Sequence, residues 1–355
     1  MAALLLCLSG CGSEKAPAPA AAETSAAAET PAAGTDAGTV IRLTGDGAEI
    51  QGGGARVQGS AVTIGAVGTY TVSGTLNDGQ LIVDTGDEAM DVTLILDGVS
   101  ISNSIDAALY IRQAKNVRLQ LLGTSTLISG TEADLAAYDD TASGAALFSE
   151  DDLDIEGTGT LEIRGYLNNG ITCKDDLDIN SGTITVLAAN NGIRASESIQ
   201  LKGGAVTVSS GNDGLKTSSV KKDGKGYVEI RGGELRVNAA GDGIQAASEL
   251  LLQGGSVQIC AEKQALQAEG GIHLGGGELL ALCDSNKQAP PDSSELPWLL
   301  CNMTGRDGDQ LTVGEIGSIR ADCGYKMVLC ASEALPAGGT VTLANGRSSV
   351  TATVQ

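Results

Sequence analysis

The sequence predicts an all-β fold, a right-handed parallel β-helix that ends in a small C-terminal β cap. Three observations predict it. A short turn motif recurs at nearly constant spacing, three short runs of alternating polarity fill each interval, and glycine accounts for 50 of the 355 residues. Repeats of about 20–50 residues that each hold several short strands are typical of solenoids, in which every repeat stacks on its neighbours.

The turn motif consists of Asn or Asp, then Gly, then an aliphatic residue. Its glycines lie 22, 22 and 29 residues apart, and the longest interval contains an insertion around residues 221–225. Upstream, Ala108-Leu109-Tyr110 and Ala146-Leu147-Phe148 occupy the same place in their repeats, and downstream Ala265-Leu266 does. The four motif glycines are Gly170, Gly192, Gly214 and Gly243.

Each repeat is expected to form one coil with three strands, as in 170–173, 177–179 and 183–186. Coils lie about 4.8 Å apart, so residues 40–283 have room for roughly ten of them. The crossover rule for parallel strands predicts right-handed winding. Inward side chains should then stack in columns. One predicted column contains Ile171, Ile193, Leu215 and Ile244, and another contains Leu153, Leu177, Ile199 and Leu251.

The period is lost after Pro290-Pro291. We therefore expect a β-helix over residues 40–289 and a small β cap over residues 290–355, with short strands near 311–313, 326–329 and 339–343. A cap suits the end of a coil stack, because the last coil would otherwise expose unpaired backbone groups.

The N-terminal residues resemble a bacterial lipoprotein signal. The segment Leu8-Ser9-Gly10-Cys11 is similar to a lipobox, which implies cleavage before Cys11 and acylation of its thiol. Residues 12–39 are rich in Ala, Pro, Thr and Glu and cannot bury a core, so we expect a disordered tether there. With residues 1–11 as signal and lipobox, the protein is expected to be extracytoplasmic, anchored to the bacterial membrane or cell surface only through its lipid.

Composition excludes several classes of function. The chain carries 44 acidic and 22 basic side chains, and this net charge of −22 argues against nucleic acid as a partner. One Trp, six Tyr and one Phe are few for a sugar-binding face built mainly on ring stacking, and a single histidine, His273, excludes a His-rich metal site. No cysteine pair has zinc-ligand spacing, but Cys260 and Cys283 lie about one coil apart and could form a disulfide if they are in register.

Several segments, taken in order, resemble a known family, the carbohydrate-binding β-helix proteins of bacterial surfaces, which are related to pectate lyases in fold. The resemblance covers about residues 40–285. It implies binding of calcium and of acidic plant polysaccharide such as polygalacturonate or pectin, with cellulose as a further candidate, and no established catalytic activity. The segments that carry it are Gly68-Thr69-Tyr70-Thr71-Val72-Ser73-Gly74-Thr75-Leu76, Leu94-Ile95-Leu96-Asp97-Gly98-Val99, Asp151-Asp152-Leu153-Asp154-Ile155, Lys174-Asp175-Asp176-Leu177 and Gly241-Asp242-Gly243-Ile244-Gln245-Ala246.

Four carboxylates are predicted to form a grid on one outer face. Asp152 and Asp154 flank an inward leucine, and Asp176 and Asp178 take the same places one coil later. Like charges stacked about 4.8 Å apart repel one another. Calcium, which takes roughly six to eight oxygen ligands, would relieve that repulsion. The carboxylates beside the grid are Asp151 and Asp175.

Asp213 and Asp242 define a second candidate calcium site, in a column of turn residues that also contains Asn169 and Asn191. The alternative is structural, because Asn and Asp before Gly suit left-handed turns and stacked amides can satisfy one another.

Two cations are predicted to stack on the outward side of the first strand. Arg194 and Lys216 take the position that Thr172 has one coil earlier, Gln245 follows, and Lys174 lies at the next outward position. Arg pairs bidentately with carboxylates and Lys acts as a point charge, so this column is the predicted contact for a uronate chain. The alternative is pairing with the chain's own carboxylates. Because a chain at −22 repels a polyanion, calcium and glycan binding should be coupled.

The leading hypothesis is therefore a non-catalytic, calcium-dependent binding protein for acidic polysaccharide. One alternative is a polysaccharide (pectate) lyase, for which Arg194, a poor base among carboxylates, is the only candidate base. The other is a structural or adhesive surface rod with no glycan ligand.

Overall fold

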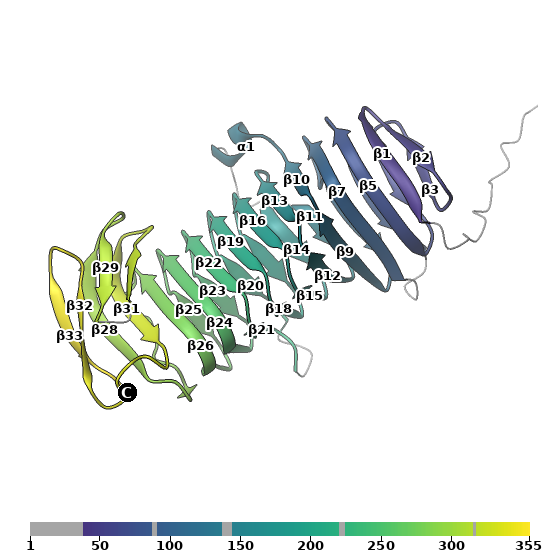
Figure 1. Cartoon of the computed structure of the whole chain (residues 1–355). Helices are drawn as coiled ribbons and strands as arrows, with labels where there is room; N and C mark the ends of the chain where they lie inside the picture. Colours follow the sequence, from purple (N-terminus) through teal and green to yellow (C-terminus); the bar gives the residue numbers. More distant parts are fainter. Residues whose placement is uncertain (1–37, 87–90, 137–143, 220–223, 315–316) are drawn as a thin grey trace, which may run out of the picture. The chain divides into compact units, whose positions relative to one another are not determined.

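The computed structural model describes residues 38–86, 91–136, 144–219, 224–314 and 317–355 (Figure 1). The predicted signal, Cys11 and almost all of the predicted tether lie outside these ranges. Within them the chain is all-β apart from one short helix, α1 (Glu132–Ala136). In the same ranges, no helix combines the length and apolarity that crossing a membrane requires.

The strands of the described ranges form three sheets. Sheet A contains β1 (Thr39–Gly45), β2 (Ala48–Gln51), β5 (Gly68–Leu76), β7 (Asp91–Asn103), β9 (Asn116–Leu122), β10 (Thr124–Ser129), β12 (Asp152–Gly157), β13 (Thr160–Gly165), β15 (Asp176–Ile179), β16 (Thr183–Ala188), β18 (Ser198–Leu201), β19 (Ala205–Ser210), β21 (Tyr227–Ile230), β22 (Glu234–Ala239), β24 (Glu249–Ala261), β26 (Gly271–Cys283), β27 (Ser293–Ser294), β28 (Trp298–Gly305) and β31 (Tyr325–Ala331). Sheet B contains β3 (Ala55–Gln58), β4 (Ala61–Ile64), β6 (Gln80–Asp84), β8 (Leu109–Gln113), β11 (Ala145–Ser149), β14 (Asn169–Cys173), β17 (Ile193–Ala195), β20 (Leu215–Thr217), β23 (Ile244–Ala246) and β25 (Leu266–Ala268). Sheet C contains β29 (Gln310–Val313), β30 (Gly317–Arg320), β32 (Thr340–Ala344) and β33 (Ser349–Thr353).

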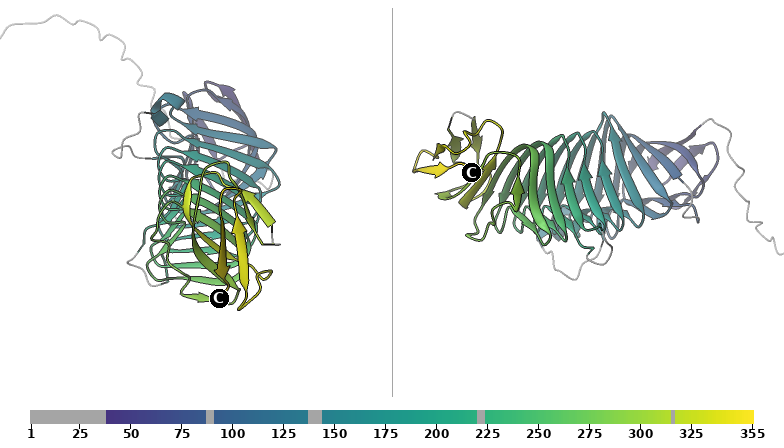
Figure 2. Two further views of the ribbon diagram at one scale, coloured as in Figure 1. Left: turned by 90° about the vertical axis from the view of Figure 1, so that its left-hand side faces the viewer. Right: turned by 90° about the horizontal axis from the view of Figure 1, so that it is seen from below.

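Successive repeats pair in parallel, one strand in sheet B and two in sheet A, as Figures 1 and 2 show for β14 to β26. The first predicted column is confirmed, because Ile193 lies in register between Ile171 and Leu215, and Leu215 pairs with Ile244. All four side chains are buried.

The second predicted column is right for three of its four members. Leu153, Leu177 and Ile199 are in register, but the column continues through Val228 to Leu250. The prediction of Leu251 was wrong because β24 is offset by one residue, which places Leu251 beside the polar Glu229.

Sheet A closes on itself. From β7, parallel pairs run through β9, β12, β15, β18 and β21 to β24, and return through β22, β19, β16, β13 and β10. The ring closes because β7 and β24 bend at Gly98 and Gly255, which have φ of 67° and 79°, so each pairs along both of its halves. The predicted open right-handed parallel β-helix is therefore corrected: in its pairing, sheet A is a closed parallel barrel of twelve strands.

The C-terminal strands correct the prediction of a small separate cap. β26 pairs with β27 in parallel and with β31 antiparallel, and β31 pairs with β28. The strands β27, β28 and β31 therefore continue sheet A. Only sheet C stands apart. A disulfide joins Cys260 of β24 to Cys323, whereas Cys283 is a free thiol, so the suggested Cys260–Cys283 pair does not form.

The motif glycines are required by close stacking rather than by turn geometry. None of the four has a positive φ. A Cβ on Gly192 would lie 2.1 Å from Val208 Cγ1 and 2.8 Å from the carbonyl oxygen of Gly214 in the next repeat. The same clash with a branched side chain and a following carbonyl recurs at Gly170, Gly214 and Gly243.

We predict that Ile193→Ala lowers the free energy of unfolding by about 2–5 kcal/mol, because it opens a cavity in a fully buried column. Urea unfolding followed by circular dichroism measures the change. Thr185→Ala, at an exposed outward position of β16, is the matched control and should stay within about 0.5 kcal/mol of the parent. Equal effects of the two substitutions would contradict the assigned column.

Candidate functional site

The outward side of sheet B carries one column of side chains whose character changes along the sheet. Tyr110 pairs with Phe148, Phe148 with Thr172, and Thr172 with Arg194. The column continues through Lys216 and Gln245 to Gln267. The structure thus places the sequence-predicted residues Arg194, Lys216 and Gln245 in one row. It adds two aromatic residues, Tyr110 and Phe148, that were aligned with the motif but not predicted as site residues.

A pocket of 420 Å³ opens at the aromatic part of this column. Its walls come from β8, β11, β14 and β17, and from the segment before β8 that contains Asp106. Six of the side chains that line it matter for its chemistry: Tyr110, Phe148, Glu150, Asn169, Lys174 and Arg194.

The two aromatic rings form a corner on one side of the pocket. Their centroids lie 5.6 Å apart with an interplanar angle of 81°, an edge-to-face contact. The ammonium of Lys174 lies 5.6 Å from the centroid of the Phe148 ring, within cation–π range. The Tyr110 hydroxyl donates to Glu150 Oε1 at 3.3 Å. Burial, and then the Glu150 charge, raise the pKa of Tyr110, so this phenol stays neutral at physiological pH.

The predicted cations differ in whether a carboxylate of the protein neutralises their charge. Lys216 Nζ lies 2.7 Å from Asp213 Oδ2, an ion pair in which the carboxylate is buried. Within the part of the chain that the structure describes, Arg194 and Lys174 make no ion pair, although both line the pocket. The alternative of internal pairing therefore holds for Lys216. Arg194 and Lys174 remain as the positive charges available at the pocket.

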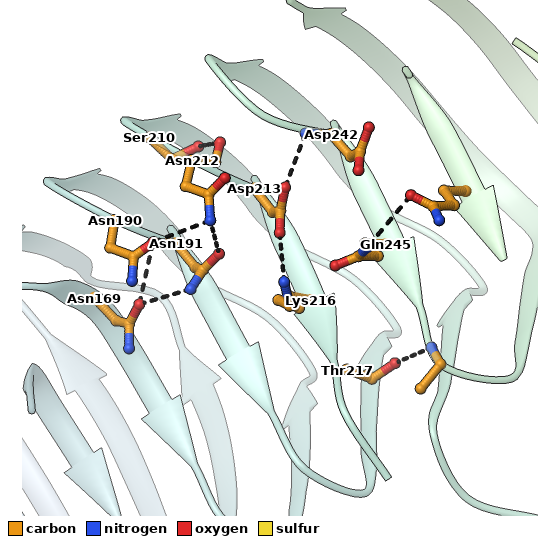
Figure 3. Close-up of polar contacts among 12 residues, drawn as sticks. Asn169, Asn190, Asn191, Ser210, Asn212, Asp213, Lys216, Thr217, Asp242 and Gln245 are labelled. Atoms are coloured by element: carbon orange, nitrogen blue, oxygen red, sulfur yellow. Dashed lines mark hydrogen bonds and ion pairs between the residues drawn. The ribbon is translucent and has the colours of Figure 1, made fainter. Parts of the chain in front are cut away.

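The turn column is a hydrogen-bonded ladder (Figure 3). Asn169 Oδ1 accepts from the backbone and side-chain amides of Asn191, at 3.1 and 3.0 Å. Asp213 Oδ1 accepts from the backbone N–H of Asp242 at 2.9 Å, and Asp242 Oδ1 from that of Gln264 at 2.8 Å. These oxygens tie each repeat to the next, which supports the structural alternative for Asp213 and Asp242.

The carboxylate grid is present in register, with Asp154 beside Asp178. The chain supplies its own cations there. Lys225 Nζ lies 2.5 Å from Asp176 Oδ2 and 3.0 Å from Glu197 Oε2, and Lys202 Nζ lies 2.5 Å from Asp178 Oδ2. These lysines relieve the repulsion that suggested calcium.

Two further grid oxygens have partners inside the protein, whereas Asp178 Oδ1 is buried and has no hydrogen-bond partner among the described residues. Asp152 Oδ1 accepts from the backbone N–H of Asp176 at 3.2 Å, and Asp154 Oδ2 from Asn116 Nδ2 at 2.9 Å. Asp151 Oδ2 accepts from the backbone N–H of Ala114, and Asp175 is half-buried just before β15. Across the described ranges, no three Asp, Glu, His or Cys side chains converge as metal ligands would. Calcium binding at the grid therefore stays a prediction.

Sequence reasoning missed Tyr110, Phe148 and Glu150. The signal was present, because Tyr110 and Phe148 end the segments that align with the turn motif. Aligning those segments places both rings in the row of Arg194. The low aromatic content directed attention away from them, although two clustered rings are enough for one platform.

In each comparison with known proteins, the match has a name that refers to carbohydrate. A family model described as "Carbohydrate-binding domain-containing protein" matches residues 58–353. A relative of that description from Acetivibrio thermocellus is 40% identical over 131 residues, which span 36% of this chain and 45% of the relative, so less than half of that relative is matched. A solved structure titled "polysaccharide lyase-like protein from C. thermocellum, Gadolinium derivative" superimposes with a TM-score of 0.63 at 31% identity. It covers 68% of this chain and 100% of its own.

We predict that Asp242→Asn raises the melting temperature at pH 7. Burial, with a further contribution from Asp213, raises the pKa of Asp242, so the folded state binds this proton more tightly than the unfolded chain. Such a group adds stability below its unfolded-state pKa, and this is lost as pH rises through the folded-state pKa. Asn keeps the Oδ1 acceptor, as at Asn169.

Thermal unfolding at pH 7 and pH 3 tests this. The gain should be present at pH 7 and absent at pH 3, where Asp242 is protonated. Asp307→Asn, which removes an exposed carboxylate, is the control and should change neither value much. A gain of equal size at both pH values would show that charge burial is not its cause.

Proposed function

The chain belongs to the family of carbohydrate-binding domain-containing proteins, and we propose that it binds an acidic polysaccharide along the outward column of sheet B. One observation carries the proposal: an aromatic corner and two cations without ion pairs meet in one pocket. The ligand that matches both features is a sugar ring that carries a carboxylate.

The aromatic corner supplies the apolar contact. Sugar rings present C–H faces that pack on aromatic rings, and the edge-to-face pair of Tyr110 and Phe148 holds both rings in place. Neutral glycans such as cellulose would use this contact as well. The cations therefore decide the preference for acidic glycans.

Arg194 and Lys174 supply that preference. A guanidinium binds a carboxylate bidentately, and both side chains line the pocket. Asn169 and Thr172, also in the lining, add polar groups for hydroxyls. Polygalacturonate or pectin carries carboxylates on successive rings, so one chain can contact the pocket and then follow the polar column toward Gln245.

We propose that binding is non-catalytic. β-Elimination from a uronate needs a base that is deprotonated near neutral pH. Burial raises the pKa of Tyr110, the opposite of what a base needs. The two carboxylates that line the pocket already accept hydrogen bonds inside the protein, Glu150 from the Tyr110 hydroxyl and Asp106 from the backbone N–H of Ala107. The name of the structural neighbour, a polysaccharide lyase-like protein, keeps lyase activity as the alternative. The appearance of ultraviolet-absorbing unsaturated products during incubation with polygalacturonate would establish that alternative.

Two further parts of the sequence hypothesis stay predictions. Display at the bacterial surface depends on Cys11, outside the described residues. Calcium dependence is supported by the net charge of −22, which repels a polyanion, and by the gadolinium derivative of the structural neighbour, since gadolinium is a hard cation with a preference for oxygen ligands.

We predict that Arg194→Gln weakens polygalacturonate binding roughly tenfold or more, because a charged hydrogen bond contributes about 1.5–3 kcal/mol and about 1.4 kcal/mol is tenfold. Affinity electrophoresis or calorimetry measures it. Lys216→Gln is the matched control and should change binding less than about threefold, since Asp213 already pairs with that lysine. Equal losses of affinity in both variants would show that the glycan contacts the whole column rather than the pocket.

We predict that Phe148→Ala weakens binding of both polygalacturonate and cellulose, because ring contacts contribute about 0.5–1.5 kcal/mol whatever the charge of the sugar. Arg194→Gln should weaken polygalacturonate binding alone. If Phe148→Ala binds both glycans as the parent does, the aromatic corner is not the platform.

We predict that calcium strengthens polygalacturonate binding when compared with chelator at equal ionic strength, because a divalent cation lowers the repulsion between two polyanions. Cellulose, which carries no charge, is the control and should bind equally in both conditions. The same affinity for polygalacturonate with and without chelator would show that binding does not depend on calcium.

A further inference from the structure

A second pocket, of 430 Å³, lies on sheet A, far along the chain from the first. Its floor is the outward side of β19, β22 and β24. Its wall comes from the segment before β29, from the end of β30 and from the residues just after β30. No residue lines both pockets. Its lining combines the polar side chains of Thr207, Ser209, Asn238 and Gln258 with two cations, Arg236 and Arg320, and two carboxylates, Asp307 and Asp322.

The floor carries a row of polar side chains in register. Thr207 pairs with Arg236, and Arg236 with Gln258. Within the described ranges, Arg236 has no ion pair or side-chain hydrogen bond, whereas Arg320 lies 3.8 Å from Asp322 in a largely exposed pair. In a chain with net charge −22, Arg236 is an exposed guanidinium aimed at a cavity and free to bind an anion.

The wall is held in place before any ligand arrives. The disulfide between Cys260 and Cys323 joins the floor to the wall, and Asn238 Nδ2 donates to the backbone carbonyl of Asp322 at 3.3 Å. Backbone hydrogen bonds from Gly308 to Ala321 and from Ala321 to Asp309, both 2.9 Å, join the two wall segments. A pocket fixed in this way loses little conformational entropy on binding.

We propose that this pocket is a second binding site for an acidic sugar residue, in which Arg236 binds the carboxylate and Thr207, Asn238 and Gln258 bind hydroxyls. The inference rests on the proposed function, because it assigns the same class of ligand to a separate face. The two sites would let one protein hold two polysaccharide chains, or two stretches of one chain.

Calorimetric titration with trigalacturonate, a short ligand, tests the proposal. The parent should bind two molecules per chain, Arg236→Gln one, Arg194→Gln one, and the double variant none. Arg118→Gln is the matched control: it removes an arginine that is 52% exposed and lines neither pocket, and it should bind two. Ser209→Tyr, which fills the second pocket without changing charge, should bind one.

The outcomes separate the two proposals. A parent with one site that is lost in Arg194→Gln and kept in Arg236→Gln overturns the second site and leaves the proposed function intact. One site that is lost in Arg236→Gln and kept in Arg194→Gln overturns the first pocket and supports the second. No binding to any form overturns both. If Arg236→Gln and Ser209→Tyr both retain two sites, the second ligand lies elsewhere.

Discussion

The register between successive repeats is the constraint on which the rest of this structure depends. Each motif glycine lets its backbone approach the next repeat so closely that a single added carbon would lie 2.4–2.8 Å from a carbonyl oxygen of that repeat. That contact, together with the parallel backbone hydrogen bonds, allows only one alignment. Every inward residue therefore meets its counterpart, and every outward residue joins a row. The pocket at Tyr110 and the floor at Arg236 are both consequences of this alignment.

The periodic part of the sequence predicted the interior well. Ile171, Ile193, Leu215 and Ile244 could be aligned because the motif marks each repeat at the same point. Leu251 failed because the strand that contains it belongs to two parts of sheet A and its offset is not visible in the local pattern. The closure of sheet A was missed for the same reason: β7 and β24 each bend at a glycine and pair along both halves, which alternation of polarity does not reveal.

The site was predictable in its positions more than in its chemistry. Arg194 and Lys216 were placed correctly in one row, but their different roles depend on Asp213, whose carboxylate turns toward Lys216 rather than toward Arg194. One of the lysines at the grid comes from outside the repeat pattern, since Lys225 belongs to the insertion and reaches back 49 residues to Asp176. Composition also misled, because a small number of aromatic residues says nothing about whether two of them are neighbours.

The ladder of turn residues changes from amides to carboxylates along sheet B. An amide can both accept and donate, whereas an ionised carboxylate only accepts, so Asp213 and Asp242 take part in the ladder only as acceptors of backbone N–H groups. The second oxygen of Asp213 takes a donor from elsewhere. Lys216 is that donor, and its charge is used within the protein. The outer row is consequently asymmetric, with rings and free cations at one end and neutral amides at the other. A polysaccharide has a reducing and a non-reducing end. Its two possible orientations along such a row make different contacts and therefore differ in binding energy.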